Sequence, residues 1–462
     1  MNDEHSISRR AFLGNALAGA AAISAVGPAD AQTTRPSAPT GVHIVMPGSQ
    51  GKRLLQFTDF QFLGGFRLPM TTMGLDVRFG RGLAHRYLGT DLRFFSTGHK
   101  TTSTPATVRD GEVFEFGYPG VSMTAPFPMA PILRHWGDIY QSKIAVGTPE
   151  GKHWTIPDMP RGLFWDEPGQ RLYWSYACGG AGDDSYCALT ESCTLGASVL
   201  DNSTGKAQAV GAWRIGPAPY KCVMRGCLPI PQWFADAYTH GRRIGVGFGG
   251  NFSMMNNGGV SHGPSLWAID PPSTPHLTTV DATTLVSYHP PNPRPYTSPF
   301  RCQRPANYRT QLDGWAVRDG VGYWSWTDEI HQSCVWIDLP DKHGVVFFPI
   351  LGEGLLFYVN GATKAEKALH WWMAMDPNDF AKVIRGELRR DRVAPAWWQQ
   401  IDYPQVAYPA GSGWQSEWPS FFGKIPRVVG STFDPTTRTL FLMLMTKPWP
   451  QSEQTIFAYR VI

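Results

Sequence analysis

Short apolar runs rich in aromatic and β-branched residues recur along the chain, and turns containing Asp, Pro and Gly separate them. One phrase returns: a run that opens with glycine, a tight turn, and a second apolar run. Such a phrase predicts two antiparallel strands joined by a turn. It occurs at 82–95, 162–176, 314–324 and 430–442, and Arg242–Phe248 supplies a similar strand without the preceding half.

The apolar centres of these phrases are spaced by about 70 to 80 residues, with one double-length gap, which indicates a repeated structural unit. A small antiparallel sheet of this size cannot bury both faces alone, and a β-propeller solves this by packing sheets around an axis. The sequence therefore predicts an all-β fold: a single β-propeller of five to seven antiparallel blades, six being the best estimate. The alternating run Thr455–Ile462 is expected to pair with an early strand and close the ring.

Two segments break the strand pattern and predict short helical insertions. They are Pro231–His240, ended by Gly241, and Asp379–Arg390, entered through Asp376 and Pro377. The composition agrees with a mostly β chain, because 39 prolines, 49 glycines and 13% aromatic residues accompany only 17% charged residues. The formal net charge of +4 is mild for 462 residues, which argues against a nucleic-acid-binding protein.

The first residues have the pattern of an export signal. Ser8–Leu13 contains paired arginines, an alanine-rich apolar run follows, and Ala29–Ala31 offers small residues for cleavage. We expect a twin-arginine signal peptide at 1–31, a linker at 32–55 and the propeller at 56–462. No later stretch has the roughly 18 apolar residues of a membrane span. The expected location is the periplasm or the extracellular space, reached through the twin-arginine export machinery.

Seven cysteines fit an exported protein, and their odd number leaves at least one thiol unpaired. Short spacings make Cys187 with Cys193 and Cys222 with Cys227 candidate disulfides, and Cys302 with Cys334 could join two segments. None has the spacing of a zinc site. We predict no metal ligand and no firm cofactor; a structural divalent cation such as calcium, near Asp183 and Asp184, is the alternative.

Three stretches resemble a known group of proteins. They are Phe62–Pro69, the blade phrase at 162–173, and Gly247–Gly250. Together they resemble a widespread group of exported bacterial β-propeller proteins of uncharacterised function. The resemblance covers nearly all of the mature chain. It implies the propeller fold and export, and it brings no catalytic residues.

Chemistry-bearing residues gather in four segments that lie between predicted strands, where propeller loops converge. In the first, an acid, an imidazole, a phenol and a guanidinium accompany an aromatic ring, a set suited to proton transfer at a leaving oxygen. Blade packing of the aromatic residues is the alternative. The residues are Arg134, His135, Trp136, Asp138 and Tyr140.

The second segment, Arg294–Asp338, holds the densest chemistry of the chain. It is predicted to end in a hairpin between 321–327 and 334–338, with two carboxylates and an imidazole in the turn. Arginines among aromatic rings suit an anionic or sugar-like ligand. Ordinary solvated ion pairs are the alternative. The candidates are Arg301, Arg304, Arg309, Trp324, Trp326, Asp328, Glu329 and His331.

The remaining two segments are polar loops after strong strands. Glu417 lies between Trp414 and Trp418, and apolar neighbours raise a carboxyl pKa as a general acid requires. Asn251 and His262 lie in a long polar loop that could contact sugar hydroxyls.

The leading hypothesis is a glycoside hydrolase acting on an oligo- or polysaccharide with a carboxylate pair drawn from Asp138, Asp328, Glu329 and Glu417. A polysaccharide lyase on a uronate-containing glycan is the first alternative: an arginine would neutralise the carboxylate, and His135, Tyr140 or His331 would transfer protons. A glycan- or protein-binding propeller without catalysis is the second. An oxidoreductase ranks last.

Overall fold

The structure is a computed structural model that divides into two units, Met1–Ile44 and Val45–Ile462. All described residues belong to the second unit. They are residues 51–69, 71–72, 75–76, 81–100, 111–139, 162–176, 193–216, 223, 225–248, 264–273, 278–287, 317–318, 321–322, 333–359, 362–390, 392–403, 406, 427–445 and 454–462. Only the backbone is described for residues 71–72, 75–76, 99–100, 111, 193, 317–318, 321–322, 350–359, 362–369 and 427.

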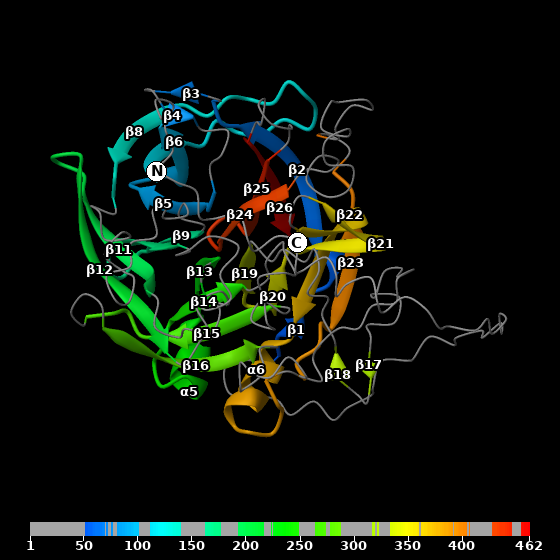
Figure 1. Ribbon diagram of the computed structural model, residues 1–462. Coiled ribbons are helices and arrows are strands. Elements are labelled where there is room, and N and C mark those ends of the chain that lie inside the picture. The colour runs from blue at the N-terminus through cyan, green and yellow to red at the C-terminus, as the bar shows by residue number, and fades with distance from the viewer. Residues whose placement is uncertain are drawn as a thin grey trace, which may run out of the picture. The chain divides into compact units, whose positions relative to one another are not determined.

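The strands form sheets of six, eight, two, four and six strands. The eight-stranded sheet consists of two antiparallel halves joined only where β12 and β16 pair in parallel. With those halves counted separately, the described strands form five blades around a centre (Figure 1). The all-β propeller is therefore confirmed, with five blades in place of the best estimate of six.

We number the blades I to V from the one in which β2 pairs with the C-terminal strand β26. Blade I consists of β24 (Arg427–Asp434), β25 (Thr439–Met445), β26 (Gln454–Val461) and β2 (Phe60–Arg67). Blade II consists of β5 (Ala84–Leu88), β6 (Asp91–Lys100), β7 (Gly111–Gly117) and β8 (Ile132–Gly137), with the short β3 (Thr71–Thr72) and β4 (Leu75–Asp76) beside β6.

The other three blades follow in chain order. Blade III consists of β9 (Gly162–Asp166), β10 (Arg171–Ser175), β11 (Cys193–Asp201) and β12 (Lys206–Gly216). Blade IV consists of β13 (Gly226–Pro229), β14 (Ile244–Phe248), β15 (Ser265–Ile269) and β16 (Thr279–Ser287). Blade V consists of β19 (Cys334–Asp338), β20 (Lys342–Phe347), β22 (Ala362–Met375) and β23 (Trp397–Ile401), with β1 (Arg53–Leu54) and β21 (Ile350–Val359) at its edges.

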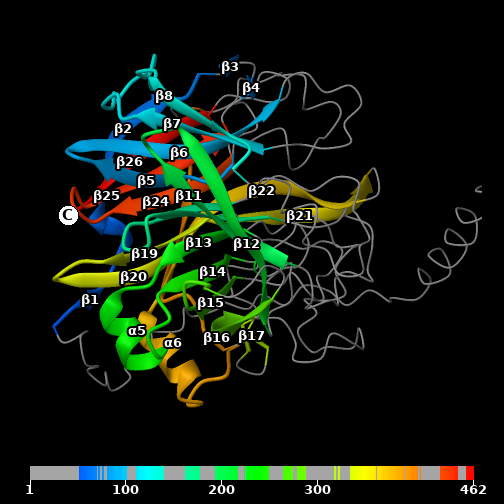
Figure 2. The same cartoon turned by 90° about the vertical axis from the view of Figure 1, so that its left-hand side faces the viewer.

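The first strand of each blade is the innermost one. β24, β5, β9, β13 and β19 each contact the next strand of this series, and β19 contacts β24, which closes a ring (Figure 1). Figure 2 shows the blades from the side. The described hydrophobic core lies between the blades. It consists of five clusters, and each cluster joins two neighbouring blades.

The sequence estimate of six blades arose from the phrase at 314–324. In the structure, β17 (Val317–Arg318) and β18 (Val321–Gly322) form a separate two-stranded sheet, and β19 pairs with β20. Within the described residues, the predicted hairpin between 321–327 and 334–338 is therefore not formed. Blade V starts at Cys334, so the phrase at 314–324 does not open a blade among the described strands.

Both predicted helices are present. α5 (Gln232–Tyr238) connects β13 to β14, and α6 (Pro377–Ile384) connects β22 to β23. α6 starts at its predicted cap but ends earlier than expected, with Gly386 in the left-handed region (φ 75°). No helix within the described residues is long and apolar enough to cross a membrane.

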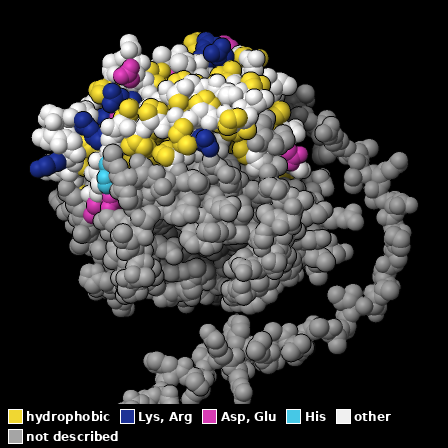
Figure 3. All heavy atoms as spheres, turned by 90° about the horizontal axis from the view of Figure 1, so that it is seen from above, with side chains coloured by type: hydrophobic (Ala, Val, Ile, Leu, Met, Phe, Trp, Pro, Cys, Tyr) yellow, Lys and Arg dark blue, Asp and Glu magenta, His cyan; other side chains and the backbone are white. Residues whose placement is uncertain are grey.

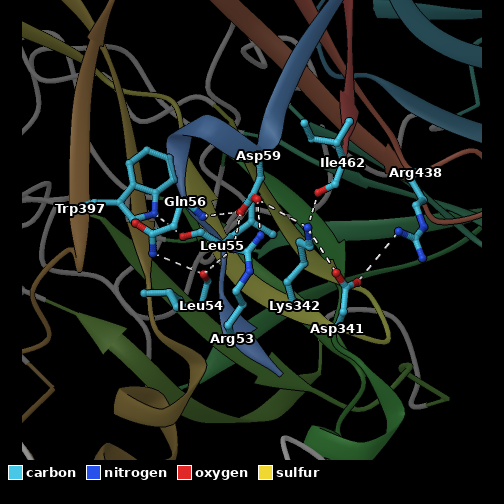
Figure 4. A network of polar contacts seen from close by, with 10 residues as sticks. All are labelled: Arg53, Leu54, Leu55, Gln56, Asp59, Asp341, Lys342, Trp397, Arg438 and Ile462. Atoms are coloured by element: carbon cyan, nitrogen blue, oxygen red, sulfur yellow. Dashed lines mark hydrogen bonds and ion pairs between the residues drawn. The ribbon is translucent and has the colours of Figure 1, made fainter. Parts of the chain in front are cut away.

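The expected closure of the ring is confirmed: β26 pairs with β2 along its whole length. A second link joins blades I and V, because β1 pairs in parallel with β20 and the short 3-10 helix η1 (Phe57–Asp59) leads from β1 into β2. Figure 4 shows the polar network at this link. Asp59 binds the guanidinium of Arg53 and lies 3.5 Å from the ammonium of Lys342, which also donates to the carbonyl of Ile462.

Candidate functional site

The inner strands approach one another most closely where they begin. A β-carbon added to Gly162 would lie 2.2 Å from the Cα of Gly226, and one added to Gly430 would lie 2.8 Å from the carbonyl carbon of Gly82. The amide of Gly82 donates to the carbonyl of Val429, which links blades II and I directly. Only glycine permits backbones to pack this tightly, which explains the glycine that opens the recurring phrase.

We call this end of the ring the candidate end. The register pairs Ser175 with Leu195, Phe248 with Ser265, and Met445 with Gln454 there. The described strands on either side of every predicted site segment end at the candidate end. Most predicted site residues themselves lie outside the described residues: Tyr140, Asn251, His262, Arg301, Arg304, Arg309, Trp324, Trp326, Asp328, Glu329, His331, Trp414 and Glu417.

The described part of the first segment lies on β8, the outermost strand of blade II. Strand alternation sends its side chains to two different faces. The guanidinium of Arg134 lies 4.8 Å from the Trp136 ring, and Trp136 packs in the cluster between blades II and III. His135 instead contacts Glu112, with Nε2 and Oε2 2.5 Å apart. Arg134 and Trp136 therefore lie on one face of β8 and His135 on the other, although the three residues are consecutive in sequence.

Trp136 takes part in a buried structural group. Its indole N–H donates to Glu115, whose carboxylate also accepts a bidentate pair of hydrogen bonds from Arg86. The Arg86 guanidinium lies 5.0 Å from the rings of both Phe95 and Trp165. This arrangement joins blades II and III. Trp136 therefore packs between blades, which is the alternative to a role in ligand binding. Asp138 follows β8 at the candidate end.

His135 and Glu112 form an acid–base pair that the sequence did not suggest as a pair. Glu112 lies on β7 and its side chain is 6% exposed, whereas that of His135 is 26% exposed. Two backbone irregularities lie beside the pair. One is a register shift between Val113 and Phe114, and the other is Gly137 in the left-handed region (φ 68°). Such bulges re-aim side chains. The sequence alone did not predict a role for Glu112, because its partner His135 lies on the neighbouring strand and not nearby in sequence.

Further polar groups lie at the starts of the inner strands. The hydroxyl of Thr97 donates to the carbonyl of Arg81 and accepts from its amide, which fixes the chain just before β5. The hydroxyls of Ser333 and Ser431 are 2.5 Å apart and join blades V and I. Arg225, directly before β13, is a fully buried arginine. The hydroxyl protons of Thr97, Ser333 and Ser431 are donated within the protein, so these groups fix the starts of the inner strands.

The opposite end of the ring, which we call the turn end, holds tight turns and ion pairs. Arg243 donates to both oxygens of Asp166, which joins blades IV and III. Nearby, burial raises the pKa of Tyr173 to about 12. Tyr87 donates to Asp434 across blades II and I, and burial with this carboxylate raises the pKa of Tyr87. These groups bridge blades and are engaged with each other.

Two of the proposed disulfides are wrong. Cys227 and Cys334 are free, buried thiols within inner strands, and burial raises the pKa of each. Their strands bury them in hydrophobic clusters on either side of blade IV, where they pack as small apolar residues. Asp183 and Asp184 lie outside the described residues. Among the residues that are described, no group of three His, Cys, Asp or Glu side chains could hold a metal ion.

An apolar surface follows the outer edges of blades I and II, seen from above in Figure 3. Exposed Tyr118, Met123, Met129 and Leu133 contribute to it. The segment after β7 covers the free edge of β2 here, since Gly65 and Ser122 exchange backbone hydrogen bonds and Ala130 donates to Arg67. This pairing protects an edge strand.

No protein-family model and no curated protein matches the chain. Solved structures with a similar arrangement exist at very low sequence identity. A GH130-family structure is 10% identical, covering 88% of this chain and 96% of its own, with a TM-score of 0.42. A glycosyl hydrolase from Bacteroides ovatus is 8% identical, covering 89% and 97%, with a TM-score of 0.40. A GH43_1 enzyme from Xanthomonas citri is 9% identical, covering 86% and 90%, with a TM-score of 0.37. At these identities and TM-scores the likeness assigns no activity to this chain.

Proposed function

We propose that this chain is an exported enzyme that cleaves glycosidic bonds in an oligo- or polysaccharide, working at the candidate end of the propeller. The observation that carries the proposal is the common placement of strand ends. Every segment that holds predicted site residues connects strands whose described ends lie at the candidate end. The predicted carboxylates, arginines and indoles belong in sequence to the segments between these strand ends, which supports a shared site at the candidate end.

The chemistry of these residues suits a glycan. Indole rings stack on the apolar faces of sugar rings, and arginines and amides donate hydrogen bonds to hydroxyl groups. In the proposed mechanism, two carboxylates drawn from Asp138, Asp328, Glu329 and Glu417 divide the work. One protonates the leaving oxygen, and the other acts as nucleophile or as base toward water. His135, held by Glu112, is a further proton donor at this end.

The first test incubates the mature protein with a panel of neutral and acidic polysaccharides. New reducing ends and the ultraviolet absorbance of an unsaturated uronate are followed together. Reducing ends without absorbance are expected for hydrolysis. Both signals rising on an acidic glycan would replace the hydrolase with the lyase, and silence across the panel would contradict both enzymatic proposals and favour a binding propeller.

Variants then assign the carboxylates. Glu417→Gln, Asp328→Asn and Glu329→Gln are each compared with Asp91→Asn, which removes an exposed carboxylate at the turn end. Loss of a catalytic carboxylate is expected to lower kcat by about 10²- to 10⁴-fold. Asp91→Asn should leave it unchanged. Full activity in all variants of the candidate end would refute the proposed carboxylate pair.

A further inference from the structure

A buried histidine at the turn end lies against both helical insertions. The side chain of His343, at the start of β20, is 2% exposed. On the α5 side, the Trp233 ring lies nearly parallel to the imidazole, with the ring centroids 6.1 Å apart. On the α6 side, Nε2 of the imidazole lies 3.9 Å from Oδ1 of Asp376, the residue that caps this helix. A change of charge on His343 would therefore act on the start of α6.

Within the described part of the chain, two carboxylates and one ammonium act electrostatically on this imidazole, each from a different element. Asp376 precedes α6, Asp338 ends β19, and Lys52 precedes β1. α5 faces the imidazole with the uncharged Trp233 ring. Asp338 already accepts from Lys52 at 2.8 Å and from the Trp233 indole at 3.1 Å. Asp376 is therefore the carboxylate that a positive charge on His343 would attract.

The surroundings of His343 favour the neutral imidazole. Nδ1 is buried and has no hydrogen-bond partner among the described residues. A protonated imidazole carries N–H donors on both nitrogens, so protonation would leave a buried donor without an acceptor and place a charge out of water. Burial accordingly lowers the pKa of His343, although the two carboxylates oppose this effect. The imidazole is therefore neutral at pH 7 and can gain its proton only in acid.

Protonation would bring the imidazole into competition with the helix cap. Oδ1 of Asp376 accepts a hydrogen bond of 2.8 Å from the amide of Asn378, and the same oxygen lies nearest to His343. A separation of 3.9 Å is too long for a hydrogen bond, so an imidazolium would have to draw the carboxylate closer. α6 has only eight residues and depends on its cap and its packing. Loss of the cap would therefore loosen its first turn.

We infer that His343 is an acid-sensitive switch for α6. In the neutral form it leaves Asp376 to cap the helix, and in the protonated form it draws Asp376 away from the amide of Asn378. For a histidine whose folded-state pKa is lowered, the stability is fully present above the unfolded-state pKa of about 6.5 and falls as pH drops below it. The switch therefore acts between pH 7 and pH 5, where carboxylates of ordinary pKa stay ionised.

Hydrogen exchange at pH 7 and pH 5, corrected for the intrinsic pH dependence of exchange, tests the switch. Protection of the Asn378 and Asp379 amides should fall in acid several-fold more than protection of the β25 amides. β25 is buried along its whole length and reports global unfolding. An equal change in α6 and β25, or no change in either, would overturn the switch.

Two variants test the proposed pair. His343→Phe keeps a flat ring against Trp233 and cannot be protonated, and Asp376→Asn keeps an oxygen for the cap but carries no charge. Each should abolish the additional acid response of α6, and a response that persists in either would contradict the switch. If His343→Phe does not fold, Asp376→Asn decides alone. His240→Asn is the matched control, because it removes an exposed imidazole from a left-handed position (φ 56°) that asparagine tolerates, and it should respond like the wild type.

Urea denaturation measures the same proton independently. Between pH 7 and pH 5, the unfolding equilibrium constant of the wild type should rise by up to about 25-fold more than that of His343→Phe, as expected when one imidazole is protonated mainly in the unfolded state. Equal changes in the two proteins would refute the neutral imidazole on which the switch depends. Neither measurement involves a glycan, so the switch holds or fails independently of the proposed enzyme.

Discussion

Gly162 and Gly226 meet where blades III and IV approach most closely, and a residue with a side chain at either position would force the backbones apart. The buried charged residues act on the same scale. Arg86 and Glu115 satisfy each other between blades II and III, surrounded by aromatic rings. Single residues therefore set the distance between neighbouring blades.

We predict that Gly162→Ala lowers the free energy of unfolding by about 2 to 4 kcal/mol, since its β-carbon would overlap backbone atoms that cannot move independently. Urea denaturation of the purified variant measures this. Gly117→Ala is the matched control: its β-carbon would lie 3.2 Å from the ring of Pro131, and the expected cost is below about 1 kcal/mol. Equal stability of the two variants would disprove the close-packing argument.

At the scale of elements, each blade is an antiparallel sheet whose inner strand begins at the candidate end and whose first turn lies at the turn end. The two helices pack outside the inner ring. α6 buries Phe380 and Ala381 in the cluster between blades IV and V. Its start is fixed by Asp376, whose carboxylate accepts a hydrogen bond of 2.8 Å from the amide of Asn378. The helix is too short to be stable alone, so its cap and packing hold it.

Asp376→Ala is expected to destabilise the protein by about 1 kcal/mol, because the amide at the helix start loses its acceptor. Asp376→Asn keeps an oxygen of equal reach and should recover most of this loss. Thermal unfolding of both variants, with hydrogen exchange of the α6 amides, measures the effect. An Asn variant as unstable as the Ala variant would show that the negative charge, which lies 3.9 Å from His343, matters more than the cap.

At the scale of the whole molecule, the ring is closed by strands from distant parts of the chain. β2 completes blade I beside β26, and β1 joins blade V. Asp59 holds this closure at its centre (Figure 4). Burial raises the pKa of Asp59, but hydrogen bonds from Arg53 and the Gln56 amide and the charge of Lys342 outweigh it and hold the pKa below its ordinary value.

A lowered pKa in the folded state gives stability that is present above the unfolded-state pKa of about 4 and is lost as pH falls through the folded-state pKa. Asp59→Asn should therefore cost about 1 to 3 kcal/mol at pH 7 and little near pH 2. Chemical denaturation from pH 7 to pH 2 measures this. Asp91→Asn, at an exposed carboxylate, should parallel the wild type throughout. A constant difference between Asp59→Asn and wild type would contradict the linkage.

The candidate site was only partly predictable. The sequence predicted that its residues lie in loops between strands. In the structure Arg134, His135 and Trp136 lie within β8 instead, and most of the others lie outside the described residues. The described strands that flank those segments end at the candidate end. The sequence did not reveal that Arg134 and His135 project to different faces, nor that His135 meets Glu112. Contacts between strands depend on register, and a bulge near Val113 altered that register.

The sequence by itself determined the strand phrases, the two helices and the closing strand, because alternation, caps and turn residues act over a few neighbouring positions. Only the tertiary structure decided that the described strands form five blades, that Cys227 and Cys334 remain thiols, and that the phrase glycines lie against one another. Each of these depends on residues distant in sequence that meet across blades. Local pattern carries no information about such contacts, since many partners would satisfy the same alternation.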